Sequence, residues 1–324
     1  MPGTGLVSVI IPCFNARAWI GATLDSVFAQ RGVDIEVILV DDGSQDGSAE
    51  LVHEQFPQVT VYRTANRGPS SARNLGTQSS KGEFIQYLDA DDLLAPDKLQ
   101  TQLASLQSSG AEVAYGDWLK FCLLPDGAKL VKAQFTRQLG SSPEIDLFTG
   151  FWCPPAAYLI RRTVVDRVGG WHPNLPVIQD ARFMLDCALQ GASFIYCAGP
   201  MAEYRMHERG SVSTRSRAAF LDDCLRNALE VREWWVSRGH LDRERRRAVV
   251  DVLDMVANGS LGVDSNLFNR ACAAIDVMRR ENSIAWPLKK KIAVGMFGYR
   301  FAISSAHRLR RLPRSFHWQR AGSV

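Results

Sequence analysis

The sequence lacks any apolar run close to the roughly 20 residues that a membrane-spanning helix needs. Its start, MPGTGLVSVIIPCFN, also lacks the basic segment and long apolar stretch of a signal peptide, so we expect none. Neither internal repeats nor low-complexity segments are visible in it. A chain of 324 residues, 46% hydrophobic and 22% charged, is therefore expected to form one large or two smaller globular domains.

The seven cysteines form no CxxC pair and follow no regular spacing. This argues against a zinc site and against a disulfide framework. Cys13, Cys122, Cys187 and Cys197 lie among apolar neighbours, as reduced and buried thiols do. We therefore expect a cytoplasmic protein.

Two common nucleotide-binding motifs are also missing. After the first apolar run stands PCFNARAW (12–19), which contains neither the GxGxxG of a Rossmann site nor the GxxxxGK[ST] of a P-loop. The segment NRGPSSARNLG (66–76) contains glycine but lacks the P-loop lysine. Its Arg67 and Arg73 suit phosphate or a base edge, because a guanidinium makes planar, bidentate contacts.

Residues 282–324 contain nine lysines and arginines and no acidic residue. Because the whole chain has a net charge of +4, residues 1–281 carry a net charge of −5. This basic tail predicts an anionic partner, which by charge alone is membrane lipid, nucleic acid or an acidic protein. Of these we expect a membrane surface and no nucleic acid. One expectation is an interfacial helix on an anionic membrane, since one helical face would carry Ile292, Met296, Tyr299 and Ile303. The other is a helix packed on the body with a solvated basic face.

The first 120 residues alternate short apolar, β-branched runs with stretches of helical periodicity. Such alternation predicts crossover units and a mostly parallel sheet. Pro12 is expected to end the first strand. The expected strands are 7–11, 35–40, 59–63, 83–88 and 113–121, and the expected helices are 18–30, 48–55, 70–79 and about 96–108.

The second half is less regular up to residue 213 and helical after residue 220. We place a domain boundary near Arg215. The expected strands are 156–160, 194–197 and 202–206, and the expected helices are 180–189, 220–238, 243–261, 267–280 and about 288–311.

Polar segments follow each of the first four strands, at 12–15, 41–46, 66–73 and 89–92. Ligands of parallel sheets bind outside the carboxyl ends of the strands, so these segments predict one binding site. In the last of them Asp89, Asp91 and Asp92 follow a buried strand directly. Carboxylates this close repel one another unless water or a cation neutralises them, which makes a cation site one of two expectations.

Seven motifs lie in a fixed order between residues 6 and 214. In this order they resemble the family 2 glycosyltransferases, which transfer sugars from nucleotide-sugars. The resemblance implies a GT-A fold, a Rossmann-like and mostly parallel sheet flanked by helices. It implies a domain at 1–214, divided into a nucleotide-sugar-binding half (1–120) and an acceptor-binding half (121–214), before a helical region at 215–324. The motifs are VSVIIPCFN (7–15), VDDGSQDGS (40–48), NRGPSSARNLG (66–76), YLDADD (87–92), VGGW (168–171), QD (179–180) and YRMHERGSVS (204–213).

The resemblance also implies roles for individual residues. Asp91 and His207 would hold Mn²⁺ or Mg²⁺, hard ions that are bound through carboxylates and substrate phosphates. Asp92 would face the sugar or a structural partner, and Asp97 would lie in the first turn of its helix. The donor nucleotide would be bound by Pro12, Asn15, Asp41, Asp42, Arg73 and Asp89.

The catalytic base of the family lies in a Glu-Asp pair at the start of a helix. Here the pair is Gln179-Asp180, so the first acid is replaced and the second is retained. The resemblance therefore implies that Asp180 deprotonates the acceptor hydroxyl. Contacts with the acceptor or the diphosphate would come from Trp152, Trp171, His172 and Arg205.

The function implied is a metal-dependent, inverting transfer from a nucleoside-diphosphate sugar, with a UDP-sugar expected, to a hydroxyl of a saccharide or lipid-linked saccharide. Cell-surface polysaccharide synthesis at the inner face of the membrane is the expected setting. A sugar nucleotidyltransferase is one alternative, but it would normally carry a glycine-rich, lysine-containing loop near the first strand. A non-catalytic nucleotide-sugar or glycan-binding module is the other, and the presence of Asp89, Asp91 and Asp180 argues against it.

Overall fold

The structure is a computed structural model, and it describes residues 5–207, 216–280 and 299–300. Its packing divides the chain into two compact units between Ser216 and Arg217. The boundary expected near Arg215, the motif residues 208–213 and most of the basic tail lie outside the described residues.

Within the described residues of the first unit, nine strands form one sheet. The path along it is β3-β2-β1-β4-β8-β6-β9-β5, with β7 paired to β6. Its first four strands are parallel, and the side chains of Val7, Val9, Ile10 and Ile11 are 0% exposed. A strand covered on both faces explains the unbroken apolar run. These strands are β1 (Val7–Cys13), β2 (Ile35–Asp41), β3 (Thr60–Arg63) and β4 (Phe84–Tyr87).

The second half of the sheet pairs in both directions, so the mostly parallel sheet that we expected is only partly found. β6 and β9 are parallel, whereas β4–β8, β6–β8, β5–β9 and β6–β7 are antiparallel. A turn at Gly127 (φ 82°) joins β6 to β7, and its Pro-Asp-Gly sequence was a turn signal that we did not use. These strands are β5 (Leu93–Leu94), β6 (Val113–Leu123), β7 (Lys129–Phe135), β8 (Tyr158–Arg161) and β9 (Phe194–Arg205).

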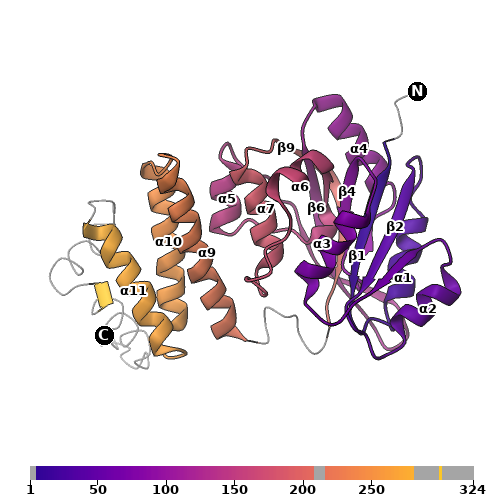
Figure 1. Ribbon diagram of the computed structural model, residues 1–324, viewed down its shortest axis with the longest axis horizontal. Helices are drawn as coiled ribbons and strands as arrows, with labels where there is room; N and C mark the ends of the chain where they lie inside the picture. The colour runs from indigo at the N-terminus through magenta and orange to yellow at the C-terminus, as the bar shows by residue number, and fades with distance from the viewer. Residues whose placement is uncertain (1–4, 208–215, 281–298, 301–324) are drawn as a thin grey trace, which may run out of the picture. The chain divides into compact units, whose positions relative to one another are not determined.

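Helices flank the sheet (Figure 1), and the mixed α/β fold class is confirmed. The chain between 136 and 178 holds α5, α6 and the 3₁₀ turn η1 (Pro155–Ala157), which sequence periodicity did not reveal because they are short. The helices are α1 (Ile20–Phe28), α2 (Ser48–Gln55), α3 (Pro69–Ser79), α4 (Lys98–Ser109), α5 (Pro143–Thr149), α6 (Arg162–Val168) and α7 (Gln179–Leu189).

Strand β1 continues through Pro12 to Cys13, so the expectation that Pro12 ends it was wrong. The Cys13 carbonyl accepts the Asp42 N–H on the β2 side at 2.8 Å, and the Ile10 carbonyl accepts the Leu88 N–H on the β4 side at 3.1 Å. Alternation then places the missing N–H of Pro12 on the β4 side. Strand β4 has ended there, so the proline breaks no ladder bond.

Two further boundaries differ from expectation. Helix α4 begins at Lys98, after Asp97 in the left-handed conformation (φ 58°), so Pro96 and Asp97 precede the helix instead of forming its first turn. The strands expected at 194–197 and 202–206 form the single strand β9, whose pairing with β6 shifts register near Asp117. A bulge of this kind interrupts the period-2 pattern that sequence analysis uses.

The second unit contains the helices α9 (Arg217–Ser237), α10 (Arg243–Ser260) and α11 (Ser265–Arg280), which lie side by side (Figure 1). Asp242 caps α10 by accepting the Arg245 N–H at 2.9 Å. Tyr299 is 1% exposed and its hydroxyl bonds to Asp254, so it lies inside this unit, as a packed helix would require. In the described part of the chain, no helix has the length and apolarity needed to cross a membrane.

Helix α3 lies close to the sheet because Gly76 has no side chain. A Cβ at this position would come within 2.5 Å of Ile10 Cγ2 and 3.5 Å of Val40 Cγ2. We therefore predict that Gly76→Ala destabilises the protein by about 1–3 kcal/mol through overpacking, measured by urea unfolding.

The matched control is Gly21→Ala in α1, where a Cβ would meet nothing within 4 Å. This variant should gain about 0.4–1 kcal/mol, because alanine is the better helix former. Equal effects of the two substitutions would contradict the close approach of α3 to β1.

Candidate functional site

The carboxyl ends of β1 and β2 carry two loops that are bonded to each other. Asn15 has a positive φ of 49°, which asparagine tolerates better than most residues. Its N–H donates to Ser44 Oγ at 2.9 Å, and its Oδ1 accepts the Gln45 N–H at 2.9 Å. The exposed ring of Phe14 stands beside Asn15, and sequence analysis had not singled it out. Pro12 lies directly before these loops.

Asp41 and Asp42 are buried at the end of β2, and both hold backbone amides. Asp41 Oδ1 accepts the Ser44 N–H at 3.0 Å. The two oxygens of Asp42 accept the Arg67 and Gly68 N–H groups, each at 2.8 Å. Asp42 therefore fixes the start of α3. Oδ1 also accepts the Thr64 hydroxyl at 3.3 Å, whereas Oδ2 keeps a second acceptor position, so a contact from Asp42 to a nucleotide base remains a prediction.

Arg73 on α3 is the buried centre of the site, with 3% of its surface exposed. Its guanidinium forms an ion pair with Asp89 and donates to Gln179 Oε1 at 3.1 Å. The guanidinium also lies 4.2 Å from the centre of the Trp171 ring. One side chain thus joins α3, the loop after β4 and the start of α7.

Asp89 lies among charges of both signs. Burial raises its pKa, Asp91 and Asp180 raise it further, and Arg73 opposes them. Since Arg73 joins Asp89 to Gln179, the residue directly before Asp180, the acids after β4 and the acid on α7 belong to one site. Sequence separation hid this proximity.

Asp91 and His207, the two residues expected to hold a metal ion, lie in direct contact, with 2.6 Å between Asp91 Oδ2 and His207 Nε2. Trp19, which sequence analysis had not singled out, supports the imidazole at 4.5 Å between ring centres. Arg205 donates from Nε to the Asp91 carbonyl at 2.8 Å. Burial lowers the pKa of Arg205.

A divalent cation bound by Asp91 and His207 would need further ligands from a substrate. Among the side chains that the structure describes, no group of three His, Cys, Asp or Glu residues is placed to hold a metal ion. One carboxylate and one imidazole supply two ligands. Magnesium and similar ions commonly complete such a set with phosphate oxygens and water, so the donor set suits a metal–diphosphate complex.

Asp92 is turned inward and has a structural partner, one of the two roles expected for it. It is 1% exposed, and its Oδ1 accepts the Arg205 N–H at 2.9 Å. Its Oδ2 has no hydrogen-bond partner within the described residues. Burial, with the neighbouring charges of Asp91 and Asp89, raises the pKa of Asp92 well above its ordinary range.

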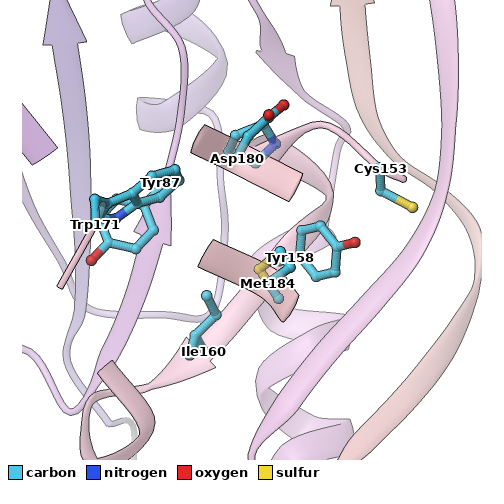
Figure 2. Close-up of a pocket in the computed structure, with 8 residues that line it drawn as sticks. Tyr87, Cys153, Tyr158, Ile160, Trp171, Asp180 and Met184 are labelled. Carbon is cyan, nitrogen blue, oxygen red and sulfur yellow. The ribbon is translucent and has the colours of Figure 1, made fainter. Parts of the chain in front are cut away.

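Asp180, the expected base, is the second residue of α7. Its Oδ2 accepts the indole N–H of Trp152 at 2.7 Å, which orients the carboxylate. A small cavity of about 10 Å³ lies beside it, lined also by Cys153, Tyr158 and Met184 (Figure 2). That volume holds about one water molecule. Burial raises the pKa of the Cys153 thiol to about 12, so Cys153 is no nucleophile at neutral pH.

Gln179 takes over a bonding role at the position where the family has its first acid. Its Oε1 accepts the Ser70 hydroxyl at 2.7 Å in addition to Arg73. Because the amide is neutral, Asp89 is the carboxylate that pairs with Arg73 among the described residues. Ser70 was missed by sequence analysis, since a serine within a helix carries no distinctive signal.

Trp171 and His172 lie on the inner side of this network. Trp171 is 3% exposed and stacks on Phe183 at 4.3 Å between ring centres. The His172 carbonyl accepts the Ser70 hydroxyl at 3.3 Å. An acceptor contact from Trp171 would require the ring to leave this packing, so it remains a prediction, as does one from His172.

Comparison with known proteins now adds to this geometry. The model of the family described as Glycosyl transferase family 2 matches residues 8–167. An uncharacterized glycosyltransferase of Haemophilus influenzae is 31% identical over 188 residues, covering 56% of this chain and 71% of the relative. The chain belongs to glycosyl transferase family 2. The resemblance stated from the motifs is thereby confirmed, and the protein is a transferase that uses a nucleotide-sugar donor.

Other relatives and solved structures are also similar to this chain. The succinoglycan biosynthesis protein ExoO of Rhizobium meliloti is 36% identical over 111 residues, which cover 33% of this chain and 32% of ExoO. TarS of S. aureus in complex with UDP-GlcNAc superposes with a TM-score of 0.69 at 16% identity, covering 95% of this chain and 93% of that one. The mannosyltransferase PcManGT of Pyrobaculum calidifontis, in complex with GDP-Man and Mn²⁺, gives 0.52 at 17% identity, covering 94% and 88%. At such identities the two structures show the shared fold alone.

The buried carboxyl of Asp92 predicts a pH-dependent stability. Its pKa is raised in the folded protein, so the unfolded chain releases this proton first as pH rises above about 4. The free energy of unfolding of wild type therefore falls as pH rises. The Asp92→Asn variant lacks this contribution, because an asparagine side chain does not titrate. The stability of the variant relative to wild type should rise from pH 4 upward, by at most about 1.4 kcal/mol per pH unit. Urea unfolding in metal-free buffer measures it.

Asp97→Asn is the control, because Asp97 lies on the same loop with its side chain exposed. Its stability difference from wild type should change little over the same pH range. If the Asp92→Asn difference also stays constant with pH, the carboxyl of Asp92 is not held in its protonated form by burial.

Proposed function

We propose that the protein is a metal-dependent, inverting glycosyltransferase that transfers a sugar to a hydroxyl of a saccharide or lipid-linked saccharide. The observation that carries the proposal is the shared network of Asp89, Arg73 and Gln179. This network joins the loop that carries Asp89 to the start of α7, whose second residue is Asp180, the candidate base. Donor-side acids and a separate carboxylate are what a single displacement needs.

In the proposed reaction Asp180 accepts the proton of the acceptor hydroxyl while the oxygen attacks the anomeric carbon. The bond from that carbon to the diphosphate breaks in the same step, so the configuration inverts. The Trp152 N–H keeps the carboxylate in one orientation during the attack. No covalent sugar–enzyme intermediate is required.

Asp91 and His207 would hold a divalent cation, Mn²⁺ or Mg²⁺, together with the donor diphosphate. When bound, such an ion neutralises the charge that develops on the leaving diphosphate. Arg205, buried beside Asp91, adds a fixed positive charge at the same place. Asn15, Asp41 and Asp42 would surround the nucleoside at the ends of β1 and β2.

The donor and the acceptor are inferred from relatives. TarS was crystallised with UDP-GlcNAc and PcManGT with GDP-Man, and we propose a UDP-sugar for this protein. The name of ExoO supports a role in polysaccharide biosynthesis. We assign donor binding to residues 1–120 and acceptor binding to 121–214. The seven free cysteines support a cytoplasmic protein, which we place at the inner face of the membrane through its basic tail.

Asp180→Asn tests the base. The variant should lose about 10²–10⁴-fold in turnover, because the amide cannot accept the proton. The measurement is release of UDP from UDP-sugars, to water or to added saccharides. Asp186→Asn on the same helix is the matched control, since Asp186 pairs with Arg182 away from the reacting groups, and it should keep its turnover. If Asp180→Asn turned over donor at the wild-type rate, the base would lie elsewhere.

A thermal-shift series with UDP, GDP, dTDP and CDP tests the donor site. UDP at 100 times its dissociation constant should add about 2.7 kcal/mol of stability, and Mn²⁺ should increase the shift. Asp91→Ala should lose the Mn²⁺-dependent part and keep the remainder. If Mn²⁺ leaves the shift of wild type unchanged for every nucleotide, the proposed metal dependence is wrong. If all four nucleotides leave the melting temperature unchanged, the proposed donor site is wrong for the protein in the absence of acceptor and membrane.

A further inference from the structure

Four aromatic side chains gather on the side of the first unit that holds Asp180. They are Trp118 of β6, Phe135 of β7, Tyr204 of β9, and Trp152 of the loop between α5 and η1. These four residues are called the aromatic cluster. Trp118 and Phe135 stack at 4.0 Å with nearly parallel planes, and Trp152 meets Trp118 edge-on at 5.1 Å. Trp118 is buried, whereas the other three rings are half-buried and present apolar surface to solvent.

The aromatic cluster is joined directly to the candidate base. Trp152 contacts Trp118 and Tyr204 through its ring and donates its N–H to Asp180. A molecule lying on these rings would therefore have one edge at the Asp180 carboxylate. Aromatic faces suit the apolar faces of sugar rings, because both are flat and weakly polar.

Lys120 supplies a positive charge within the aromatic cluster. Its Nζ lies 5.5, 5.3 and 5.8 Å from the ring centres of Trp118, Phe135 and Tyr204. Over the part of the chain that the structure describes, Lys120 has no ion pair and no side-chain hydrogen bond. The ring faces attract the ammonium but accept none of its three N–H bonds strongly.

Other lysines of this unit are satisfied differently. Lys129, on the same hairpin, pairs with Glu203 at 2.8 Å. Lys98 is fully buried and donates to the Tyr158 carbonyl at 2.7 Å and to Gln86. Lys120 is half-buried with neither kind of partner, so its ammonium can pair with an external anion that lies beside these rings.

We propose that Lys120 and the aromatic cluster form an acceptor subsite for a saccharide that carries an anionic substituent, either a phosphate ester or a carboxylate. This inference rests on the proposed function, since it makes Asp180 the group that receives the acceptor hydroxyl. The sugar ring lies on the half-buried rings and its anion pairs with Lys120. Asp180 repels an anion, so the opposite charges of Asp180 and Lys120 admit the acceptor in one orientation.

The test measures the binding of three sugars to the full chain by ligand-observed NMR titration. Glucose 6-phosphate, glucuronate and glucose share one ring and differ in charge. The donor site is first filled with the nucleoside diphosphate that stabilises the protein most, so that the phosphate ester cannot bind there. We expect wild type to bind at least one of the two anionic sugars about tenfold more tightly than glucose. Preference for the phosphate or for the carboxylate names the substituent.

Substitutions at Lys120 then locate the preference. Lys120→Gln should abolish the preference for an anionic sugar, because it removes the positive charge. Lys120→Arg should largely keep the preference, because it retains that charge. Lys132→Gln is the matched control, an exposed lysine on the same hairpin outside the aromatic cluster, and it should behave as wild type. Melting temperatures show whether each variant is folded.

Two results would overturn the proposal, namely equal binding of charged and neutral sugars by wild type, or a preference that survives Lys120→Gln. Either would leave the proposed transferase function untouched, because that function is judged by nucleotide binding and by Asp180→Asn. If no nucleotide binds, the titration runs without one. The effect of Lys120→Gln on the binding of the anionic sugars then still decides whether this surface binds them.

Discussion

The geometry of the site depends on the interactions of the Arg73 guanidinium. A charge that is 97% removed from solvent must be paired, since an unpaired buried charge costs several kcal/mol. Here the partners come from two distant segments, Asp89 after β4 and Gln179 at the start of α7. Satisfying one arginine therefore fixes the donor-side acids against the helix that carries Asp180. The stacking of Trp171 on the same guanidinium holds it in place.

The acids of the site are kept close together by different means. Asp89 is held by Arg73, Asp91 by His207, and Asp92 by the Arg205 backbone. The raised pKa values of Asp89 and Asp92 reflect the cost of this arrangement, which burial dominates and mutual repulsion increases. A site that concentrates negative charge around one half-buried carboxylate–imidazole pair is suited to a cation that arrives with a phosphate-bearing substrate.

The surroundings of Asp180 differ in charge on its two sides. Toward the ends of β1, β2 and β4 the site is acidic, whereas beyond Trp152 it is aromatic and carries Lys120. The hairpin of β6 and β7 supplies both Phe135 and Lys120. The parallel strands thus carry the loops around Asp89 and Asp91, and the antiparallel hairpin carries the side chains of the proposed acceptor subsite.

The sequence determined the order of the parallel strands and helices up to residue 121, and the acids that follow β2 and β4. Continuous apolar runs, turn residues and acids directly after strands are local signals, and ordered motifs identified the family. Only the tertiary structure decided that Gln179 accepts hydrogen bonds from both Ser70 and Arg73, that Trp19 supports His207, and that Lys120 lies among three rings. These contacts join residues tens to more than one hundred positions apart, or depend on the register of a short hairpin. Neither periodicity nor composition carries that information.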